Sequence, residues 1–413
     1  MQGYLLRILP TALVSVFLIA NVQADQTEAF LAKHWQRPLS HQGVAPSHYS
    51  ALEGSLAADA CGSCHPQQHS DWSQSLHSRS MGPGLMGQLI DLPAHARDDH
   101  QSCLRCHAPL AEQADTLATE ITLNPASEPF QNTSGSKQLH RQGLVCAACH
   151  VRQQQHFGPA RRDGSIPAPG EPLPHNGWIA NDAFEDSRFC AACHQFEQDG
   201  FTLNGKLLEN TYNEWLGSTY AEQGISCQNC HMPERRHLWR GIHDAKMVRQ
   251  GVTIEAQLEN TDDLHAEATL SISNSGTGHR FPTYVTPQVV LEAYQENNQA
   301  EHIEGTESYF VVARRVALDL SEEIFDTRLT PGETVQLAYR EPRSAEAVNI
   351  VMRIWVEPDF FYQQFYASVL GAGEAKRGEP ELRQALIQAS NSRYTLFEQR
   401  LPLDPHRLDL ATH

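Results

Sequence analysis

The C-terminal part of the chain alternates apolar and polar residues with a period of two, the pattern of strands buried on one face. Turn signals such as Asn274-Ser275-Gly276 and Pro331-Gly332-Glu333 separate the alternating segments. The predicted strands are Val252–Leu258, Ala266–Ser273, Pro287–Tyr294, Phe310–Leu318, Thr334–Tyr339 and Val348–Val356. Short antiparallel strands in this number predict an immunoglobulin-like β-sandwich. Two helical stretches follow, Asp359–Leu370 and Glu379–Ser390, so we expect residues 246–413 to form a β-sandwich domain with C-terminal helices.

An apolar stretch near the start of the chain, Ile8–Ala20, follows the positive Arg7 and precedes the small residues around Ala24. This order is typical of a secretory signal peptide. The stretch has only about 13 residues, too few for a comfortable bilayer span. We therefore expect residues 1–24 to be removed, leaving a periplasmic or further exported (extracellular or outer-membrane associated) protein without a membrane span. An uncleaved membrane anchor is the alternative.

Residues 25–245 lack regular alternation. Helices are expected at Ala58–Leu76 and Asn210–Gln223, whereas Gly158–Gly177 is rich in proline and glycine.

A repeated pentapeptide, Cys-x-x-Cys-His, marks this part of the chain. Its five copies are Cys61-Gly-Ser-Cys64-His65, Cys103-Leu-Arg-Cys106-His107, Cys146-Ala-Ala-Cys149-His150, Cys190-Ala-Ala-Cys193-His194 and Cys227-Gln-Asn-Cys230-His231.

The pentapeptide is the attachment signature of a c-type haem. Its two thiols bind the vinyl groups of the porphyrin, and the adjacent histidine reaches the iron from one face. The five copies use all ten cysteines of the chain. We therefore predict five covalently bound haem c groups, with His65, His107, His150, His194 and His231 as proximal iron ligands.

Other roles for these cysteines fit less well. A disulfide framework does not need histidine after every second cysteine. A chain of 413 residues is also long enough to form a hydrophobic core without disulfide bonds. Zinc ribbons use two Cys-x-x-Cys pairs per metal, which leaves one of five pairs without a partner. A thioredoxin-like motif would occur once, near a βαβ unit. Because about forty residues per haem leave little chain for a separate core, we expect a pentahaem cytochrome c domain over residues 25–245, mainly helical and irregular, with the porphyrins as its core.

The ligand on the opposite face of each iron decides the chemistry. A second protein ligand leaves an iron that only exchanges electrons, whereas an open position can bind a small molecule. The chain has 22 histidines, of which five belong to the motifs, so histidine on both faces is the default. The candidate distal ligands are His77, His243, His237, His175 and His140, with His279 as a weaker candidate in the C-terminal region. Met81 and Met86 are better explained by packing.

The chain is acidic, with 49 acidic against 31 basic residues and a formal net charge of −18. Nucleic acid and anionic lipid are therefore unsuitable partners. We expect redox proteins as partners, such as basic cytochromes or a membrane quinol-linked complex with a positive surface. The acidic charge also increases solubility, and this explanation requires no partner.

The flanking segments resemble a known family. The run Cys61–His77, with Trp72-Ser-Gln-Ser75-Leu-His77 after the first motif, resembles the multihaem cytochromes related to the tetrahaem cytochrome c of ammonia oxidisers. Thr211–Ser218 and Gly224–Pro233 are similar to the last-haem region of that group, and Gly278-His-Arg-Phe-Pro-Thr283 resembles an appended β-domain. The resemblance implies stacked, mostly bis-histidine haems and supports His77 and His243 as distal ligands. It does not fix a reaction.

Two differences from related enzymes favour an electron carrier over an enzyme. Ammonia-forming pentahaem nitrite reductases usually have lysine in place of histidine in the catalytic motif, whereas all five motifs here end in histidine. Hydroxylamine oxidoreductases have more haems and a tyrosine bonded to the porphyrin, for which no segment matches.

The sequence therefore predicts an electron-transfer protein. The alternative is an oxidoreductase that acts on a small nitrogen or sulfur compound at one five-coordinate haem. A third possibility is haem storage or a structural role. The absence of motifs after residue 245 further predicts that residues 25–245 mature with five haems on their own.

Overall fold

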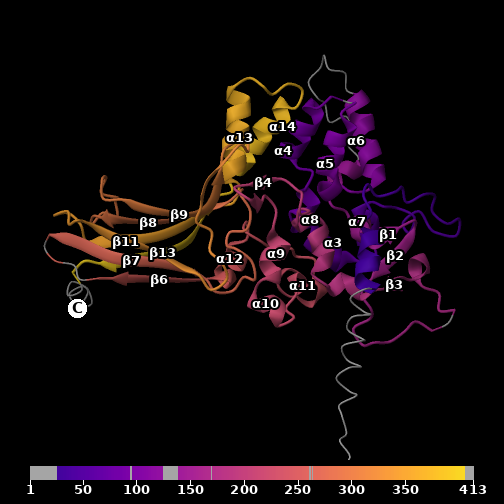
Figure 1. Ribbon diagram of the computed structural model, residues 1–413, viewed down its shortest axis with the longest axis horizontal. Coiled ribbons are helices and arrows are strands. Elements are labelled where there is room, and N and C mark those ends of the chain that lie inside the picture. Colours follow the sequence, from indigo (N-terminus) through magenta and orange to yellow (C-terminus); the bar gives the residue numbers. More distant parts are fainter. Residues whose placement is uncertain are drawn as a thin grey trace, which may run out of the picture.

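The computed structural model describes residues 26–93, 95–123, 138–168, 170–259, 262 and 264–404. The predicted signal peptide, residues 1–24, lies outside the described residues. Helices dominate the described chain up to Gly251, and long strands dominate after it, so that a β-rich arm extends from a helical region (Figure 1). None of the described helices has the length and apolarity needed to cross a bilayer.

The helical region is built from short elements. Its helices are α2 (Ala58–Gly62), α3 (Pro66–Gln74), η1 (His77–Arg79), α4 (Pro83–Asp91), α5 (Arg97–His107), α6 (Ala111–Leu123), η2 (Leu139–Gln142), α7 (Cys146–His150), η3 (Pro174–Asn176), η4 (Asp182–Glu185), α8 (Arg188–His194), α9 (Thr211–Leu216), α10 (Thr219–Glu222), α11 (Cys227–His231), η5 (Pro233–Arg235) and α12 (Ala245–Gly251). Its strands are β1 (Val151–Arg152), β2 (Gln155–Gly158), β3 (Ile179–Ala180), β4 (Thr202–Leu203) and β5 (Lys206–Leu207).

Both helices predicted for this region are interrupted. The segment predicted as one helix from Ala58 to Leu76 is α2 and α3, with Pro66 as the first residue of α3. Proline clashes with a helical residue before it and has no N–H for a helical hydrogen bond, so the chain must turn at His65. The segment Asn210–Gln223 likewise divides into α9 and α10.

The C-terminal region contains two antiparallel sheets. Its strands are β6 (Val252–Leu258), β7 (His265–Asn274), β8 (Gln288–Glu296), β9 (Ser308–Val316), β10 (Glu323–Asp326), β11 (Thr334–Pro342), β12 (Asn349–Glu357) and β13 (Tyr394–Pro402). One sheet has the order β10-β9-β8-β12-β13 and the other has the order β11-β7-β6. All six predicted strands are present. The sequence missed β10 and β13.

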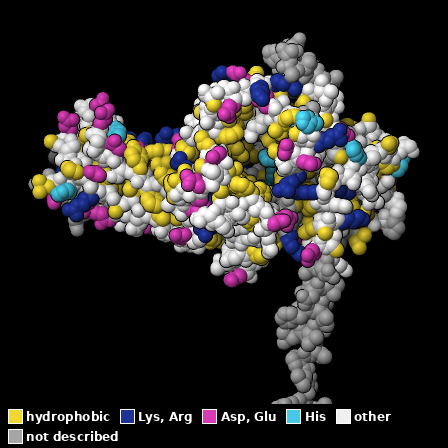
Figure 2. Space-filling model, turned by 45° about the horizontal axis from the view of Figure 1, so that its top comes forward, with side chains coloured by type: hydrophobic (Ala, Val, Ile, Leu, Met, Phe, Trp, Pro, Cys, Tyr) yellow, Lys and Arg dark blue, Asp and Glu magenta, His cyan; other side chains and the backbone are white. Residues whose placement is uncertain are grey.

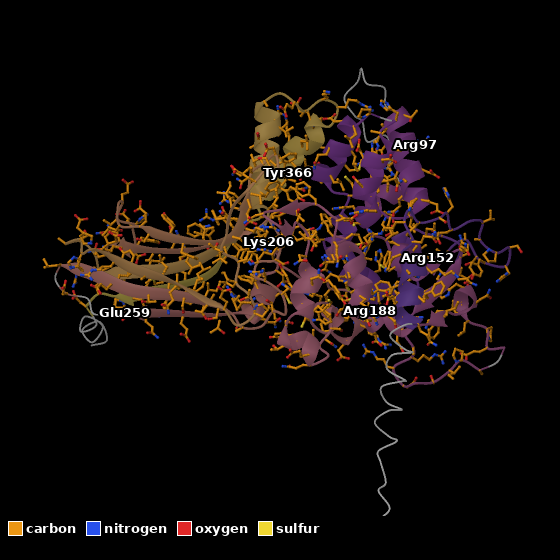
Figure 3. The ribbon with its side chains drawn as sticks, viewed as in Figure 1. Arg97, Arg152, Arg188, Lys206, Glu259 and Tyr366 are labelled. Carbon is orange, nitrogen blue, oxygen red and sulfur yellow. The ribbon has the colours of Figure 1, made fainter. Side chains whose placement is uncertain are left out.

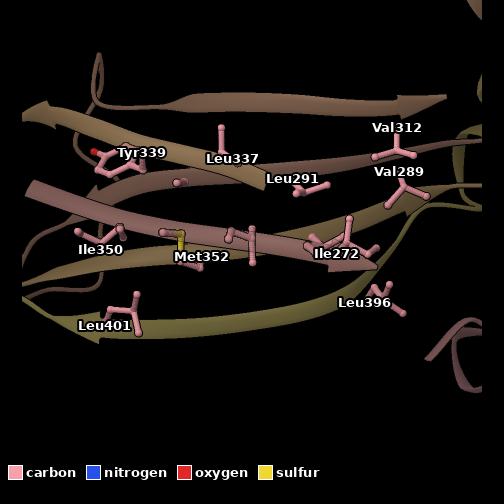
Figure 4. Packing of buried hydrophobic residues seen from close by; sticks show 14 of the residues in the cluster. Ile272, Val289, Leu291, Val312, Leu337, Tyr339, Ile350, Met352, Leu396 and Leu401 are labelled. Atoms are coloured by element: carbon pink, nitrogen blue, oxygen red, sulfur yellow. The ribbon is translucent and has the colours of Figure 1, made fainter. Parts of the chain in front are cut away.

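The core of this region lies between the two sheets. Leu270 and Ile272 of β7 pack with Leu291 of β8 and with Ile350 and Met352 of β12, all fully buried (Figure 4). The alternating exposure along β6 is that of a strand covered on one face, whereas β8, between β9 and β12, is buried along its whole length. Burial of the apolar face selects the register, because a slip of one residue would expose it.

Two helices between β12 and β13 return to the helical region. α13 (Phe360–Gly371) and α14 (Glu379–Ser390) form a hairpin, and α14 packs on α4 (Figure 1). The two backbones touch where Gly378 meets Gly87, since a Cβ on Gly378 would lie 2.0 Å from the Gly87 oxygen. The Asp91 carboxylate accepts the N–H groups of Lys376 and Gly378, both at 2.9 Å. The C-terminal helices therefore pack on α4, which itself packs on the second haem motif in α5.

Candidate functional site

Each Cys-x-x-Cys-His motif forms a helical turn. The motifs lie in α5, α7, α8 and α11, and the first begins in α2 and continues through Cys64 and His65, whose N–H groups both bond to the Cys61 oxygen. A helix places residues three and four positions apart on one face, so the two thiols and the imidazole of each motif point the same way. All ten cysteines are free of disulfides. The residues present fit a c-type haem at each motif.

The motifs are packed against one another through their thiols. Hydrogen bonding between two sulfurs lowers the pKa of the Cys61 thiol and raises that of Cys146. The same kind of contact occurs in three pairs, namely Cys61 with Cys146, Cys106 with Cys193, and Cys190 with Cys227. Cys149 also interacts electrostatically with Cys190 and Cys193. Motif 1 therefore adjoins motif 3, motif 3 adjoins motif 4, and motifs 2 and 5 both adjoin motif 4.

Backbone carbonyls orient three of the motif histidines. The Nδ1 atoms of His107, His150 and His231 lie 2.8, 2.8 and 2.7 Å from the oxygens of Ser80, Phe157 and Arg240. A carbonyl only accepts, so Nδ1 carries the proton and Nε2 keeps its lone pair. This arrangement is typical of metal-ligating histidines, because it fixes both the tautomer and the ring orientation.

Three motif histidines face a second histidine. The ring centres are 6.3 Å apart for His194 and His77, 6.1 Å for His150 and His237, and 6.4 Å for His231 and His279. Two imidazoles that bind one metal from opposite sides, each nitrogen about 2 Å from it, have centres about 6 Å apart. These three pairs therefore have the spacing of axial ligand pairs.

Backbone carbonyls orient two of the three distal histidines, whereas His77 Nδ1 has no hydrogen-bond partner among the described residues. His237 Nδ1 donates to the Arg235 oxygen at 3.1 Å, and His279 Nδ1 donates to the Arg280 oxygen at 2.9 Å. Burial lowers the pKa of His77 to about 3 and that of His237 to about 4. Both rings are therefore neutral at pH 7, the form that binds iron.

His175 lies close to the first motif. Its Nδ1 donates to the Gly177 oxygen at 2.8 Å, which leaves Nε2 free, and after burial it is the next cause of the lowered pKa of His65. The His175 ring stacks on His156, with centres 4.0 Å apart. His156, which nothing in the sequence pattern marks, is thus a second candidate for the same iron.

The structure places two predicted ligands elsewhere. His140 is fully buried, but its Nδ1 lies 3.1 Å from the Thr116 hydroxyl and its Nε2 contacts the Glu120 carboxylate, so both nitrogens are used. The Nε2 of His243 is 3.0 Å from both carboxylate oxygens of Asp359. Neither ring is paired with a motif histidine. Both residues were candidates because they lie near motifs in the sequence. The sequence could not show that the carboxylates of Glu120 and Asp359 lie beside their rings in the fold.

His107 differs from His150, His194 and His231, because no described histidine ring faces it at the spacing of those pairs, although His77 and His194 interact with it electrostatically. The buried Glu209 and the tyrosines Tyr284 and Tyr362 interact electrostatically with Cys103 or Cys106 of its motif, and Tyr284 also interacts with Cys193 of the fourth motif. Sequence reasoning missed all three. They come from segments more than 90 residues away, and nothing in their local pattern marks them.

Two comparisons with known proteins found a similar family and a similar fold. A family model described as cytochrome c554 and c-prime matches residues 60–151, which contain the first three motifs. The fold is similar to the crystal structure of a penta-haem cytochrome c552 from Thermochromatium tepidum, with a TM-score of 0.59 and 17% identity over 86% of this chain and 100% of that one. No curated protein matches the sequence. With the motif geometry, these findings support a multihaem c-type cytochrome related to the tetrahaem cytochrome c554.

Proposed function

We propose that the protein is an exported pentahaem cytochrome c that transfers electrons through closely packed, mostly bis-histidine haems. The observation that carries this proposal is the set of three histidine pairs at the spacing of axial ligands. Bound haem iron exchanges one electron between its ferric and ferrous states. The three histidine pairs would hold such an iron on both faces, which would leave no position there for another ligand.

The histidine assignments follow from the pairs, with haems numbered by their motifs. His237 would be the distal ligand of haem 3, His77 of haem 4 and His279 of haem 5. His175 is proposed for haem 1, with His156 as the alternative. We no longer propose His140 and His243, because their nitrogens bond to other side chains.

The thiol contacts support a branched electron path. Haems 1, 3 and 4 would form a line, with haems 2 and 5 both next to haem 4. Arg37 lies at the junction of haems 2 and 4, where its guanidinium is 3.7 Å from Cys106 Sγ and 3.2 Å from Cys193 Sγ. A fixed positive charge there favours the reduced state of both haems.

For the C-terminal region we propose an immunoglobulin-like sandwich. The strand order supports this. The three-stranded sheet β6-β7-β11 corresponds to strands A, B and E, and the order β13-β12-β8-β9-β10 corresponds to G, F, C, C′ and C″ of a variable-type domain. The α13–α14 hairpin would then occupy the F–G connection, at one end of the sandwich.

The charge of the protein supports a basic redox partner. Acidic side chains are scattered among basic ones on the face displayed in Figure 2, and the formal net charge is −18. Opposite charge accelerates encounter, and salt screens this attraction.

Electron transfer can be tested with a basic acceptor. We expect the reduced protein to reoxidise fully when mixed with a basic monohaem cytochrome c, and the second-order rate constant to fall as ionic strength rises from 10 to about 300 mM. Stopped-flow absorbance measures this, with an acidic cytochrome c as the control that should lack the decrease. Haems that stay reduced in the presence of excess acceptor would contradict the proposal.

A second candidate function rests on haem 2. Because His107 has no histidine opposite it among the described residues, the iron of haem 2 is proposed to have an open position. Such an iron could bind a small molecule and, with four haems to supply electrons, act as an oxidoreductase. Binding of one carbon monoxide per reduced protein would support this, and no binding would exclude it.

A further inference from the structure

The three histidine pairs differ in the hydrogen bonds of their Nδ1 atoms. Both histidines proposed for haem 3 and both proposed for haem 5 donate from Nδ1 to a backbone oxygen, at distances between 2.7 and 3.1 Å. The pair proposed for haem 4 lacks these bonds. His77 Nδ1 is buried without a hydrogen-bond partner among the described residues, and His194 is not among the motif histidines that donate to a described carbonyl.

This difference changes how strongly the ligands favour oxidised iron. A hydrogen bond from Nδ1 makes the imidazole a stronger base at Nε2. A more basic ligand stabilises ferric iron more than ferrous iron, since ferric iron carries the higher charge. Hydrogen bonds of the axial ligands are therefore among the means by which a protein sets the reduction potential of a haem. Ligands without them, such as His77 and His194, favour the reduced iron.

Packing, and not a hydrogen bond, holds the His77 ring. The Trp239 ring contacts it in an edge-on arrangement, with ring centres 4.6 Å apart. The main chain is fixed as well, because the His77 oxygen accepts from the Leu144 N–H and from the Ser80 hydroxyl, both at 2.9 Å. The ring thus keeps its position without an acceptor for Nδ1, so the missing bond is a property of the folded site.

A cation lies beside the same haem. The Arg37 guanidinium donates to the Ala192 oxygen and lies 3.2 Å from Cys193 Sγ, the atom that becomes a thioether sulfur of haem 4. Its partners are this oxygen and two sulfurs, and none of the described carboxylates pairs with it. Because its charge is not balanced by an anion, Arg37 attracts an electron to the haem.

The charges at haems 3 and 5 are different. Figure 3 labels Arg152 and Arg188, which both lie in the helical region. Arg152 interacts with Cys149, so haem 3 also has a cation beside it, and only the histidine bonds separate it from haem 4. At haem 5, Asp186 interacts with Cys227, but Arg188 lies 2.6 Å from that carboxylate and balances its charge. Both comparisons give haem 4 the stronger attraction for an electron.

Haem 4 also lies at the centre of the proposed path. His77 and His194 both interact electrostatically with His107 and His231, the motif histidines of haems 2 and 5. Cys149 of the third motif interacts with both cysteines of the fourth. An electron on any of these haems therefore has haem 4 as a neighbour.

We propose that haem 4 has the highest reduction potential of the three haems with histidine pairs, so that the junction of the path retains the first electron to enter them. His77, His194 and Arg37 are the residues that tune this potential. One electron passes from an adjoining ferrous haem to ferric haem 4, and no bond is made or broken. The inference rests on the histidine pairs of the proposed function, and it adds the order in which those haems are reduced.

A redox titration of the full-length protein, followed by electron paramagnetic resonance, tests this order. Three variants assign the signals, since His77→Ala, His237→Ala and His279→Ala should each lack the low-spin ferric signal of one haem. As dithionite is added stepwise to the wild type, the signal that is missing in His77→Ala should disappear first.

Arg37→Gln tests the contribution of charge. It should lower the equilibrium constant for reduction of haem 4 about tenfold, which corresponds to about 59 mV for one electron. Arg37→Lys keeps the charge and should stay close to the wild type. Arg383→Gln is the matched control, because Arg383 pairs with Glu379 within α14 and its side chain is 63% exposed. Haem content and low-spin intensity should be unchanged in all three variants, which excludes a structural cause.

The outcomes separate this inference from the proposed function. If the haem 4 signal disappears after that of haem 3 or haem 5, the inference fails and the histidine pairs stand. If His77→Ala keeps every low-spin signal, the pair itself is wrong and both proposals fail. An unchanged potential in Arg37→Gln would remove Arg37 from the tuning residues. Should His77→Ala not mature, His77→Met assigns the signal instead, because a methionine ligand raises the potential of that haem alone.

Discussion

Replacing His279 with alanine is expected to convert one haem from low spin to high spin while all five haems stay attached. The His279 ring lies opposite His231 at 6.4 Å, and the two planes are 18° apart. Thioether bonds do not depend on the distal ligand, so haem content should be preserved. The lost ligand opens the iron of haem 5 to water, which weakens the ligand field.

Electron paramagnetic resonance of the oxidised protein measures this change, and mass spectrometry checks the haem content. His265→Ala is the matched control, because His265 lies in β7 of the same region and its nearest charged partner is Asp262, 3.7 Å away. If His279→Ala has the spectrum of the wild type, His279 is not the distal ligand of haem 5.

The second large effect is expected at Arg314, which joins the two regions. Arg314 is 1% exposed and donates to the backbone oxygens of Leu203, Lys206 and Leu207 and to the Glu323 carboxylate. An Arg314→Met variant keeps a side chain of similar length. It removes one positive charge that balances the Glu323 carboxylate, and it leaves the backbone oxygens of Leu203, Lys206 and Leu207 without this donor. Removing one partner of a buried ion pair costs about 3–5 kcal/mol, so the β-rich region should unfold at clearly lower urea concentration.

Circular dichroism in urea measures the free energy of unfolding for this variant. Arg340→Met is the control, since Arg340 pairs with Glu267 on the surface and its side chain is 67% exposed. Exposed pairs contribute about 0–1 kcal/mol. Equal losses in the two variants would show that the bonds of Arg314 do not hold the β4–β5 hairpin to β9.

The contacts between the helical region and the β-rich region affect whether residues 25–245 can form an independent domain. The sequence predicts that residues 25–245 mature alone, since no motif follows. The structure puts His279 opposite His231, Arg328 within 3.3 Å of Glu214 and α14 against α4. A protein that ends at residue 245 would lose all three contacts. We now expect it to have at least haem 5 in the high-spin state.

Features that depend on local sequence could be predicted. The haem motifs are contiguous pentapeptides, and β6 and α14 begin and end at the predicted residues. β13 escaped prediction because its pairing with β12 shifts register between Ile354 and Trp355, which breaks the alternation of apolar residues. β10 has only four residues at a sheet edge, too few for a pattern to be recognised.

The distal side of the haems could be predicted only in part. His77, His237 and His175 lie near motifs in sequence and near motif histidines in space, whereas His279 depends on how the second region folds back. His140 shows the limit of reasoning from sequence distance. It precedes the third motif closely, yet the buried Glu120 of α6 takes its Nε2. Such choices are made by tertiary packing.

The central claim is that the histidine pairs hold the iron on both faces. Quantitative electron paramagnetic resonance of the fully oxidised, full-length protein tests it most directly. The account predicts low-spin ferric signals that integrate to at least three of the five haems, corresponding to the pairs His194–His77, His150–His237 and His231–His279, with high-spin intensity limited to haem 2 and at most one further haem. A spectrum in which most of the ferric iron is high spin would contradict it.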